Sequence, residues 1–205
     1  MERLRFILLL IFFAAVAFSG LGQMPRVVPA EPVCSDLECL RSGKDIRSLD
    51  LRKNYRDGAK PDTALLRHIV WLDLSGNRLN RVPEWVCECT SLEYLDLSRN
   101  RLNILPDCLS KLNRIKYLSA NRNPLGSLPA AMASCTQLEY LDLWQTWIDY
   151  LPIELRALDE GMKVVDLRDI RMTMEQQMEI HKVFPDAEVR MSAWCNCALR
   201  HKRSE

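Results

Sequence analysis

The sequence has little of what most catalytic sites require. Among 205 residues there are only three His and seven Gly, and few of the Gly stand close together. His68, His181 and His201 lie in no Ser, Cys or Asp frame that would orient an imidazole as a base. A Gly-rich phosphate loop and a nucleophile elbow are also missing. The sequence therefore predicts a protein that is not an enzyme and needs no cofactor.

An excess of charge of either sign is missing as well. Lys and Arg number 28 against 27 Asp and Glu, so the formal net charge is +1. Proteins that attract nucleic acid or acidic substrates through their overall field usually carry a marked basic excess. We therefore expect no nucleic-acid partner.

Long apolar runs are scarce, and the one that exists lies at the N-terminus. Charged residues precede a stretch of 13 apolar residues, Phe6–Phe18, and small residues follow it. This order is typical of a secretory signal peptide, and the run is short for a membrane span of about 20 residues. We expect residues 1–22 to be a signal peptide, with an uncleaved anchor as the alternative. The remaining chain would be a secreted or periplasmic (cell-envelope) protein without stable membrane insertion.

The rest of the chain repeats itself at a fixed interval. Leucines recur every 23 residues, and Val165 continues the series after 24. A second series of Val-Pro or Leu-Pro pairs runs in step with the first. Such a period indicates stacked supersecondary units, each of which buries its apolar face against its neighbours. The two series are Leu49, Leu72, Leu95, Leu118 and Leu141, and Val82-Pro83, Leu105-Pro106, Leu128-Pro129 and Leu151-Pro152.

The resulting pattern, LxxLxLxxNxLxxLP, resembles the leucine-rich repeat, in particular the 23-residue class found in disease-resistance and Ras-suppressor-type proteins. The resemblance covers Ile46 to Met172. It implies an α/β solenoid with a curved parallel sheet on its concave face, short helices or 3-10 turns on its convex face, and a cap at each end. Together with the signal peptide, it suggests an exported protein of bacterial type that acts as a monomer.

The segments outside the repeats divide into caps and tails. We assign residues 23–45 to a linker and N-terminal cap, in which Ser35–Glu38 has the pattern of a helix capping box. Residues 46–172 form the repeats. Residues 173–197 form a C-terminal cap, because Thr173–Gln176 is a second capping-box pattern and Glu188–Met191 alternates like a last strand. Residues 198–205 form a polar tail.

An Asn recurs where each strand is expected to end. An amide has two donor hydrogens and an acceptor, so a buried Asn can satisfy backbone groups of its own turn and of its neighbours. The next repeat carries Thr146, which supplies only part of this bonding, and Ile170 then supplies none. The series is Asn54, Asn77, Asn100 and Asn123.

Side chains that alternate with the buried leucines should point to the concave face. They form an aromatic row beside an acidic row, a composition that suits protein recognition. We predict that these side chains are exposed and contact a protein partner, although such rows can also be ordinary repeat sequence stabilised by stacking. The predicted partner-binding residues are Trp71, Asp73, Tyr94, Asp96, Tyr117, Tyr140, Asp142 and Trp144.

Two tryptophans depart from the repeat pattern. Trp144 should be exposed on the concave side, where a solitary Trp is a typical binding determinant. Trp147 should lie at the edge between the faces, where it either serves binding or packs against the C-terminal cap. Two alternatives to protein recognition stay open: binding of a cell-surface polysaccharide, and a structural role in the cell envelope.

Eight Cys raise the question of metal sites and disulfides. The two close pairs are CxC, not the CxxC of zinc sites. Cys89 and Cys135 share their repeat position with core leucines and should be buried thiols. A zinc site of Cys195 and Cys197 with His181 or His201 is a minor alternative, and the Asp row offers too few oxygens for calcium. We predict no metal. Three pairs are candidate disulfides, Cys87 with Cys108, Cys34 with Cys39, and Cys195 with Cys197, and the sequence leaves the connectivity open.

Overall fold

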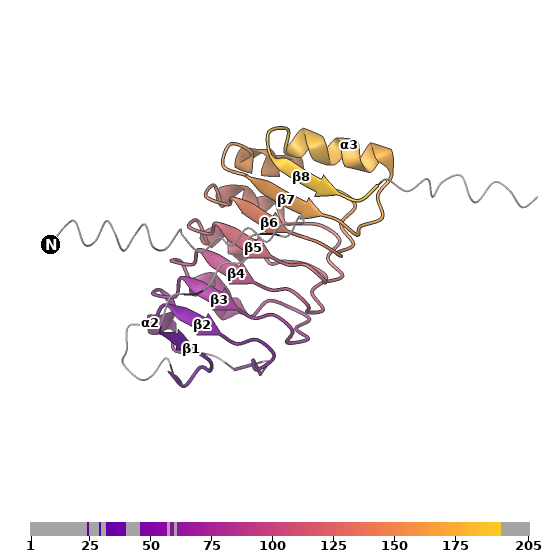
Figure 1. The fold of residues 1–205 in the computed structure, drawn as a ribbon. Coiled ribbons are helices and arrows are strands. Elements are labelled where there is room, and N and C mark those ends of the chain that lie inside the picture. Colours follow the sequence, from indigo (N-terminus) through magenta and orange to yellow (C-terminus); the bar gives the residue numbers. More distant parts are fainter. Residues whose placement is uncertain are drawn as a thin grey trace, which may run out of the picture.

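The structure is a computed structural model of the chain, and it describes residues 24, 29, 32–39, 46–56, 58–59 and 61–193 (Figure 1). The predicted signal peptide, the polar tail, Cys195, Cys197 and His201 lie outside these residues. Within them, the short elements follow one another at the interval of the sequence repeat.

Eight parallel strands form one sheet, in which each strand pairs with its neighbours along the chain. Residues one repeat apart lie directly opposite each other, as Leu72 and Leu95 do. The predicted parallel sheet is therefore confirmed. In order, the strands are β1 (Val33–Cys34), β2 (Ser48–Asp50), β3 (Trp71–Asp73), β4 (Tyr94–Asp96), β5 (Tyr117–Ser119), β6 (Tyr140–Asp142), β7 (Val164–Leu167) and β8 (Glu188–Met191).

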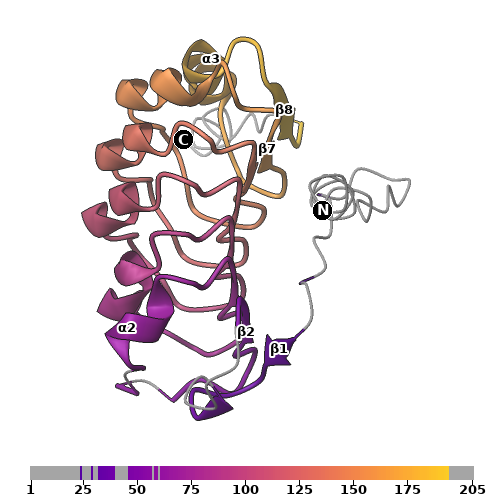
Figure 2. The same cartoon turned by 90° about the vertical axis from the view of Figure 1, so that its left-hand side faces the viewer.

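Short helices lie on the convex side of the solenoid, across from the sheet, as Figure 2 shows. Each 3-10 helix follows the Pro of a repeat, because a Pro has no N–H to leave unsatisfied at a helix start and its φ suits that position. The convex 3-10 turns implied by the repeat pattern are thus confirmed. They are η2 (Glu84–Glu88), η3 (Asp107–Lys111), η4 (Ala130–Ser134) and η5 (Ile153–Leu158), with α2 (Thr63–Leu66) before them and α3 (Met174–Val183) after them.

The core lies between these two layers, and the Asn side chains line one of its edges. Asn100 accepts from the backbone N–H groups of Asn77 and Leu79 at 2.9 and 3.0 Å. It donates to the carbonyl oxygens of Leu74 and Leu97 at 3.0 and 2.9 Å. One buried amide therefore joins its own turn to the preceding one, in line with the prediction that it serves its own and a neighbouring turn.

We call this series of Asn hydrogen bonds between successive repeats the Asn ladder. Its bonding becomes weaker at the repeats where the sequence predicted a loss. Asn123 repeats this bonding, but the Thr146 hydroxyl donates only to the Leu143 carbonyl, at 2.8 Å. The buried side chain of Ile170 has no hydrogen-bonding group.

The N-terminal cap differs from the prediction. Ser35–Glu38 forms a bend and a turn instead of a helix. The carboxylate of Asp36, not the Ser35 hydroxyl, accepts from the Cys39 N–H at 2.7 Å. A disulfide between Cys34 and Cys39 closes this turn, and β1, which the sequence did not indicate, adds a strand to the sheet.

The C-terminal cap contains the expected helix and strand. In α3, Thr173 and Gln176 form the predicted reciprocal capping box. Ile180, Val183 and Phe184 are buried against the last repeats. Met178, although apolar, lies on the exposed side of this helix.

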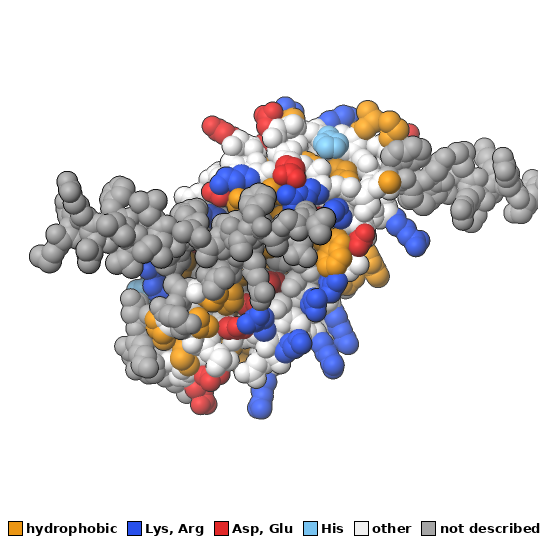
Figure 3. All heavy atoms as spheres, viewed as in Figure 1, with side chains coloured by type: hydrophobic (Ala, Val, Ile, Leu, Met, Phe, Trp, Pro, Cys, Tyr) orange, Lys and Arg blue, Asp and Glu red, His pale blue; other side chains and the backbone are white. Residues whose placement is uncertain are grey.

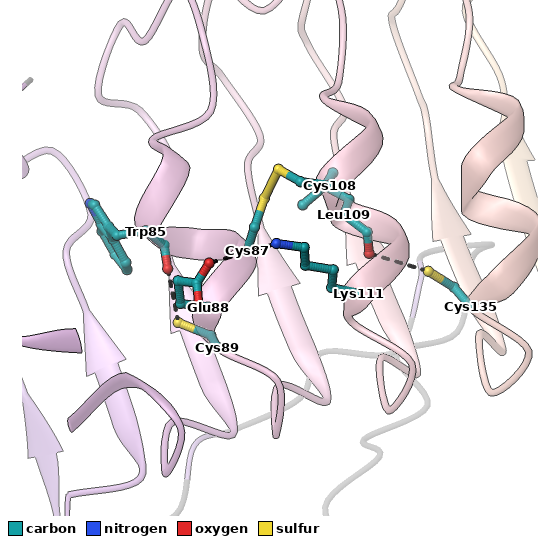
Figure 4. Close-up of a disulfide and its surroundings, with 8 residues drawn as sticks. All are labelled: Trp85, Cys87, Glu88, Cys89, Cys108, Leu109, Lys111 and Cys135. Atoms are coloured by element: carbon teal, nitrogen blue, oxygen red, sulfur yellow. Dashed lines mark hydrogen bonds and ion pairs between the residues drawn. A yellow bond between two sulfur atoms is a disulfide. The ribbon is translucent and has the colours of Figure 1, made fainter. Parts of the chain in front are cut away.

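Cysteines tie adjacent repeats together on the convex side (Figure 4). A disulfide joins Cys87 in η2 to Cys108 in η3, and the Glu88–Lys111 ion pair spans the same two helices. Cys89 is a buried free thiol, as predicted. Across the described residues, no helix has the length and apolar character required to cross a membrane.

Candidate functional site

The concave face contains an open groove of about 880 Å³ that runs across the middle strands. Its floor is made by residues that alternate with the core leucines, so the predicted rows do lie on one surface. The groove brings together seven of the eight predicted residues and leaves out only Tyr140, which adjoins its aromatic cluster.

The aromatic row is a stacked column and not a set of free rings. Trp71 and Tyr94 stack with ring centroids 5.1 Å apart, and Tyr94 and Tyr117 follow at 4.7 Å. This spacing matches the distance between adjacent strands, so each ring covers the face of the next. The prediction that these rings are exposed was wrong: Trp71, Tyr94 and Tyr117 are only 7–8% exposed. Tyr140 tilts away from the column and is half-buried.

Two further contacts occur at the β3 end of this column. Met24 packs against the cluster formed by Trp71, Tyr94 and Tyr117. Met24 and Pro29, two residues of the predicted linker, also line the groove. The indole N–H of Trp71 is buried and has no hydrogen-bond acceptor among the described residues. This N–H is a donor that a bound group with a carbonyl oxygen would satisfy.

The acidic row is neutralised at its two ends. Arg52 forms an ion pair with Asp50 and approaches Asp73 with its Nε at 3.3 Å from the carboxylate. At the other end, Arg168 pairs with Asp166 at 2.6 Å. Hydrogen bonding to Arg52 holds the pKa of Asp50 below its ordinary value, against the opposing effect of burial.

The middle of the row lacks such cations. Asp96 accepts a hydrogen bond from the Ser98 backbone N–H at 2.8 Å, but it has no ion-pair partner among the described residues. Burial, reinforced by the nearby charge of Asp73, raises the pKa of Asp96 to about 6. Burial also raises the pKa values of Asp73 and Asp142. The centre of the groove is therefore a negative region that is short of positive charge.

Asp142 is better supported by neutral donors. The Asn121 amide donates to it at 2.6 Å, and the Ser119 hydroxyl donates at 3.2 Å. Ser119 takes the position that an Asp occupies in the neighbouring strands. This break in the acidic row lets β5 supply a hydrogen-bond donor to Asp142.

Trp144 lies at the far end of the groove and is half-buried, not fully exposed as predicted. Its indole N–H donates to Asp169 at 2.9 Å, and the guanidinium of Arg122 lies 4.3 Å from the ring centroid. These contacts hold the indole in one position, a useful property in a binding residue. Trp147 is 73% exposed, so the interpretation that it packs against the C-terminal cap was wrong.

The described residues contain no group of three or more His, Cys, Asp or Glu side chains placed to hold a metal ion. His181 is exposed on α3 and has no such group around it. The proposed zinc alternative otherwise falls on residues outside the described part of the chain.

Sequence reasoning missed several residues that shape the site. Arg52 and Arg168 stand two residues after Asp50 and Asp166, so they also alternate with the core leucines, and their charge, opposite to that of the acidic row, was a usable signal. Asp169 stands one repeat after Gln145, a position from which it reaches Trp144. No periodic signal precedes β1, so the position of Met24 could not be read from the pattern.

Comparison with known proteins identifies the fold family. The leucine rich repeat family model matches residues 44–102 and 67–125. The chain contains leucine-rich repeats over these residues, and its strand pairing continues the same solenoid fold through β7. Folds of this family are general protein-interaction modules and are typically non-catalytic. No curated protein matches the sequence.

Three solved structures are similar in fold. A leucine-rich-repeat protein of Leptospira interrogans superimposes with a TM-score of 0.65 at 21% identity, covering 81% of this chain and 49% of that one. Internalin C2 of Listeria monocytogenes superimposes with a TM-score of 0.57 at 20% identity, and the match covers 77% of this chain and 66% of that one. The ectodomain of the Arabidopsis thaliana receptor kinase GASSHO1/SCHENGEN3, in complex with Casparian strip integrity factor 2, gives 0.54 at 25%, covering 78% and 20%. The chain thus spans about half the length of the Leptospira structure.

Proposed function

We propose that this chain is a non-catalytic recognition module that binds a protein partner in its concave groove. The observation that carries the proposal is the group of carboxylates at the groove centre, which the fold buries without a cation. Burial of the Asp96 carboxylate lowers the stability of the fold at neutral pH and raises the pKa of this group. Groups with strongly shifted pKa values are concentrated at functional sites. The contact residues are those predicted from the sequence, from Trp71 to Trp144.

The groove suits a partner with a Lys or Arg side chain at its centre. That cation would lie between Asp96 and Asp142, where burial strengthens the attraction. Arg52 and Arg168 at the two ends would attract acidic groups flanking the cation and would fix the direction of the bound segment. A backbone carbonyl of the partner would satisfy the indole N–H of Trp71.

Access to the aromatic end of the groove depends on Met24. Because Met24 packs on the aromatic column, a partner that reaches Trp71 and Tyr94 must displace Met24 or bind beside it. The binding energy for this end of the groove is therefore reduced by the loss of the Met24 contact.

Binding should also depend on pH. The attraction of Asp96 for a cation requires the carboxylate, and its pKa is about 6 in the free protein. We expect affinity to fall as the pH drops through this value, and we expect binding near pH 6 to release a proton.

We further propose that the mature chain is monomeric and works outside the cytosol, in the secreted or cell-envelope fraction. The Cys34–Cys39 and Cys87–Cys108 disulfides support this location, since such bonds persist in oxidising compartments. A glycan is less suited to the concave groove than a protein. Sugars stack on free ring faces, and the Trp71, Tyr94 and Tyr117 faces cover one another.

The proposal is tested by capture of partners from culture medium and envelope extract with the mature chain as bait. The variant Asp96→Asn with Trp144→Ala removes the central charge and the anchored indole without opening the core. The control, Glu154→Gln with Ile153→Ala, changes one acidic and one apolar side chain exposed on the convex side. A protein captured by wild type and control but lost by the groove variant supports the proposal, and equal capture by all three contradicts it.

A further inference from the structure

One edge of the solenoid concentrates positive charge. In three successive repeats, the loops that follow the strands (residues 74–82, 97–105 and 120–128) contain five Arg and no Asp or Glu. In the space-filling view, Lys and Arg side chains gather beside the C-terminal ends of the middle strands (Figure 3). We call Lys53, Arg78, Arg99, Arg101 and Arg122 the basic rim.

The stacking of the repeats sets the spacing of these cations. The Arg101 N–H donates to the Leu79 carbonyl at 2.8 Å, and the Arg99 N–H donates to the Asn121 carbonyl at 2.9 Å. Adjacent turns are therefore in register, and rim positions one repeat apart are separated by about the strand spacing of 4.8 Å. The rim presents two short rows of positive charge along the solenoid axis. Lys53, Arg99 and Arg122 share one repeat position, which Gly76 interrupts, and Arg78 and Arg101 share another.

Most side chains of the basic rim are exposed and available to bind a ligand. Lys53, Arg78, Arg99 and Arg101 are exposed. Within the described part of the chain, the side chains of Arg78, Arg99 and Arg101 have no hydrogen bond or ion pair. Arg122 is the exception, since its Nε donates to Gln145 at 3.1 Å and its guanidinium lies over Trp144.

The backbone under the rim would suit glycine better. Lys53, Arg99 and Arg122 have φ values of 55°, 55° and 54°, and Gly76 occupies the same repeat position with a φ of 71°. Arg78 also lies in the left-handed region, at 58°. Side chains with a Cβ are disfavoured in this conformation. Gln145 and Asp169 share this conformation at 54° and 57°, so the left-handed turn belongs to the repeat itself, and glycine fits it, as Gly76 shows.

An aromatic side chain continues the rim. Trp147 occupies the same repeat position as Arg78 and Arg101, and it is 73% exposed. With Arg122, Pro124 and Gln145, it lines an open hollow. An accessible indole face beside an amide and a guanidinium can stack on a sugar ring and pair with its acidic substituent.

We propose that the basic rim and Trp147 bind a linear polysaccharide that carries carboxylate, sulfate or phosphate groups. Guanidinium groups one repeat apart, as at Arg78 and Arg101 and at Arg99 and Arg122, can pair with successive charges of such a polymer, and the indole provides the contact that distinguishes a sugar from other polyanions. This surface borders the concave groove, whose centre is negative, and Lys53 and Arg99 lie on the boundary because they also line the groove. A glycan held by the rim residues outside the groove, Arg78, Arg101 and Trp147, would leave the groove centre open to a protein partner.

The test uses the full mature chain with two probes, heparin and polygalacturonate, and with neutral dextran as a blank. The variant Arg78→Gly with Arg99→Gly removes two rim cations at positions where glycine is conformationally preferred. We expect at least tenfold weaker binding of both anionic probes and a thermal midpoint no lower than that of wild type. A loss of binding with unchanged or higher stability rules out misfolding as its cause.

The matched control is Arg114→Ala with Arg156→Ala, which removes the same charge from exposed positions away from the rim. Equal weakening by the rim variant and this control would mean general charge attraction and would overturn the proposal. Trp147→Ala should weaken binding of polygalacturonate but not of poly-L-glutamate. The assignment to a polysaccharide is wrong if poly-L-glutamate binds as tightly as polygalacturonate. It is also wrong if Trp147→Ala leaves the affinity for both polymers unchanged.

Discussion

Asp73 and Asp96 lie directly opposite each other on the paired strands β3 and β4, and they differ in their partners. Arg52 reaches Asp73 at 3.3 Å, whereas Asp96 has no ion pair among the described residues. Two neighbouring carboxylates therefore share one cation at the edge of the groove. This imbalance makes the groove centre the place where a partner's positive charge has most to contribute.

Replacing Asp96 by Asn should stabilise the free protein at neutral pH. The folded-state pKa of Asp96, about 6, lies above its ordinary value of 3.8. The stability that this shift contributes is thus full below pH 4 and is lost as the pH rises through 6. We expect Asp96→Asn to raise the free energy of unfolding by about 2 kcal/mol at pH 7 and by little at pH 4. Urea titrations at the two pH values measure this difference.

Asp166→Asn is the matched control for that experiment. Asp166 pairs with Arg168 at 2.6 Å, so its neutralisation leaves a cation without its partner and should lower stability at pH 7. If both variants shift stability in the same direction, the account of the groove as short of positive charge is incorrect.

The Asn ladder makes a graded prediction. Asn100→Ala removes an amide that serves several backbone groups at once, and we expect a loss of roughly 3 kcal/mol or more. Thr146→Ala removes one hydrogen bond, to the Leu143 carbonyl, and should cost about 1 kcal/mol. Chemical denaturation of both variants gives the comparison, and similar losses would show that the ladder does not weaken toward the C-terminus.

Cysteine chemistry should separate into two classes. Removing the Cys87–Cys108 disulfide, which spans 21 residues, should lower stability by about 3 kcal/mol. Burial raises the pKa of Cys89 to about 12 and that of Cys135 to about 11, so neither should form a thiolate readily at pH 8. To leave only these two free thiols, Cys195 and Cys197 are changed to Ser. In this variant, iodoacetamide should label Cys89 and Cys135 only after unfolding. Rapid labelling of the native chain would contradict their burial.

The fold was largely predictable because a repeat constrains every unit in the same way. The position of Leu95 in its frame fixes the face on which Tyr94 and Asp96 lie, and strand pairing then sets their neighbours. The Pro of each repeat likewise marks the start of a 3-10 helix. Where the period stops, so does the prediction, as the turn at Ser35–Glu38 shows.

The state of the site was harder to predict than its location. Periodicity placed Tyr94 and Tyr117 on the concave face, but it carried no information on ring orientation. Stacking at the strand spacing turned these rings into a buried column, so alanine at either position would damage the fold as well as any binding. The shortage of cations at Asp96 also depends on the reach of Arg52, a distance that no sequence pattern contains.

The most direct test of the central claim is photo-crosslinking from defined positions. A photoreactive phenylalanine analogue is placed at Asn121 in the groove or at Ile153 on the convex side, which is 59% exposed, and the mature chain is illuminated in envelope extract. We predict a protein adduct from position 121 that weakens below pH 6 and is absent from position 153. An adduct of the same protein from position 153 with none from position 121 would contradict recognition through the concave face.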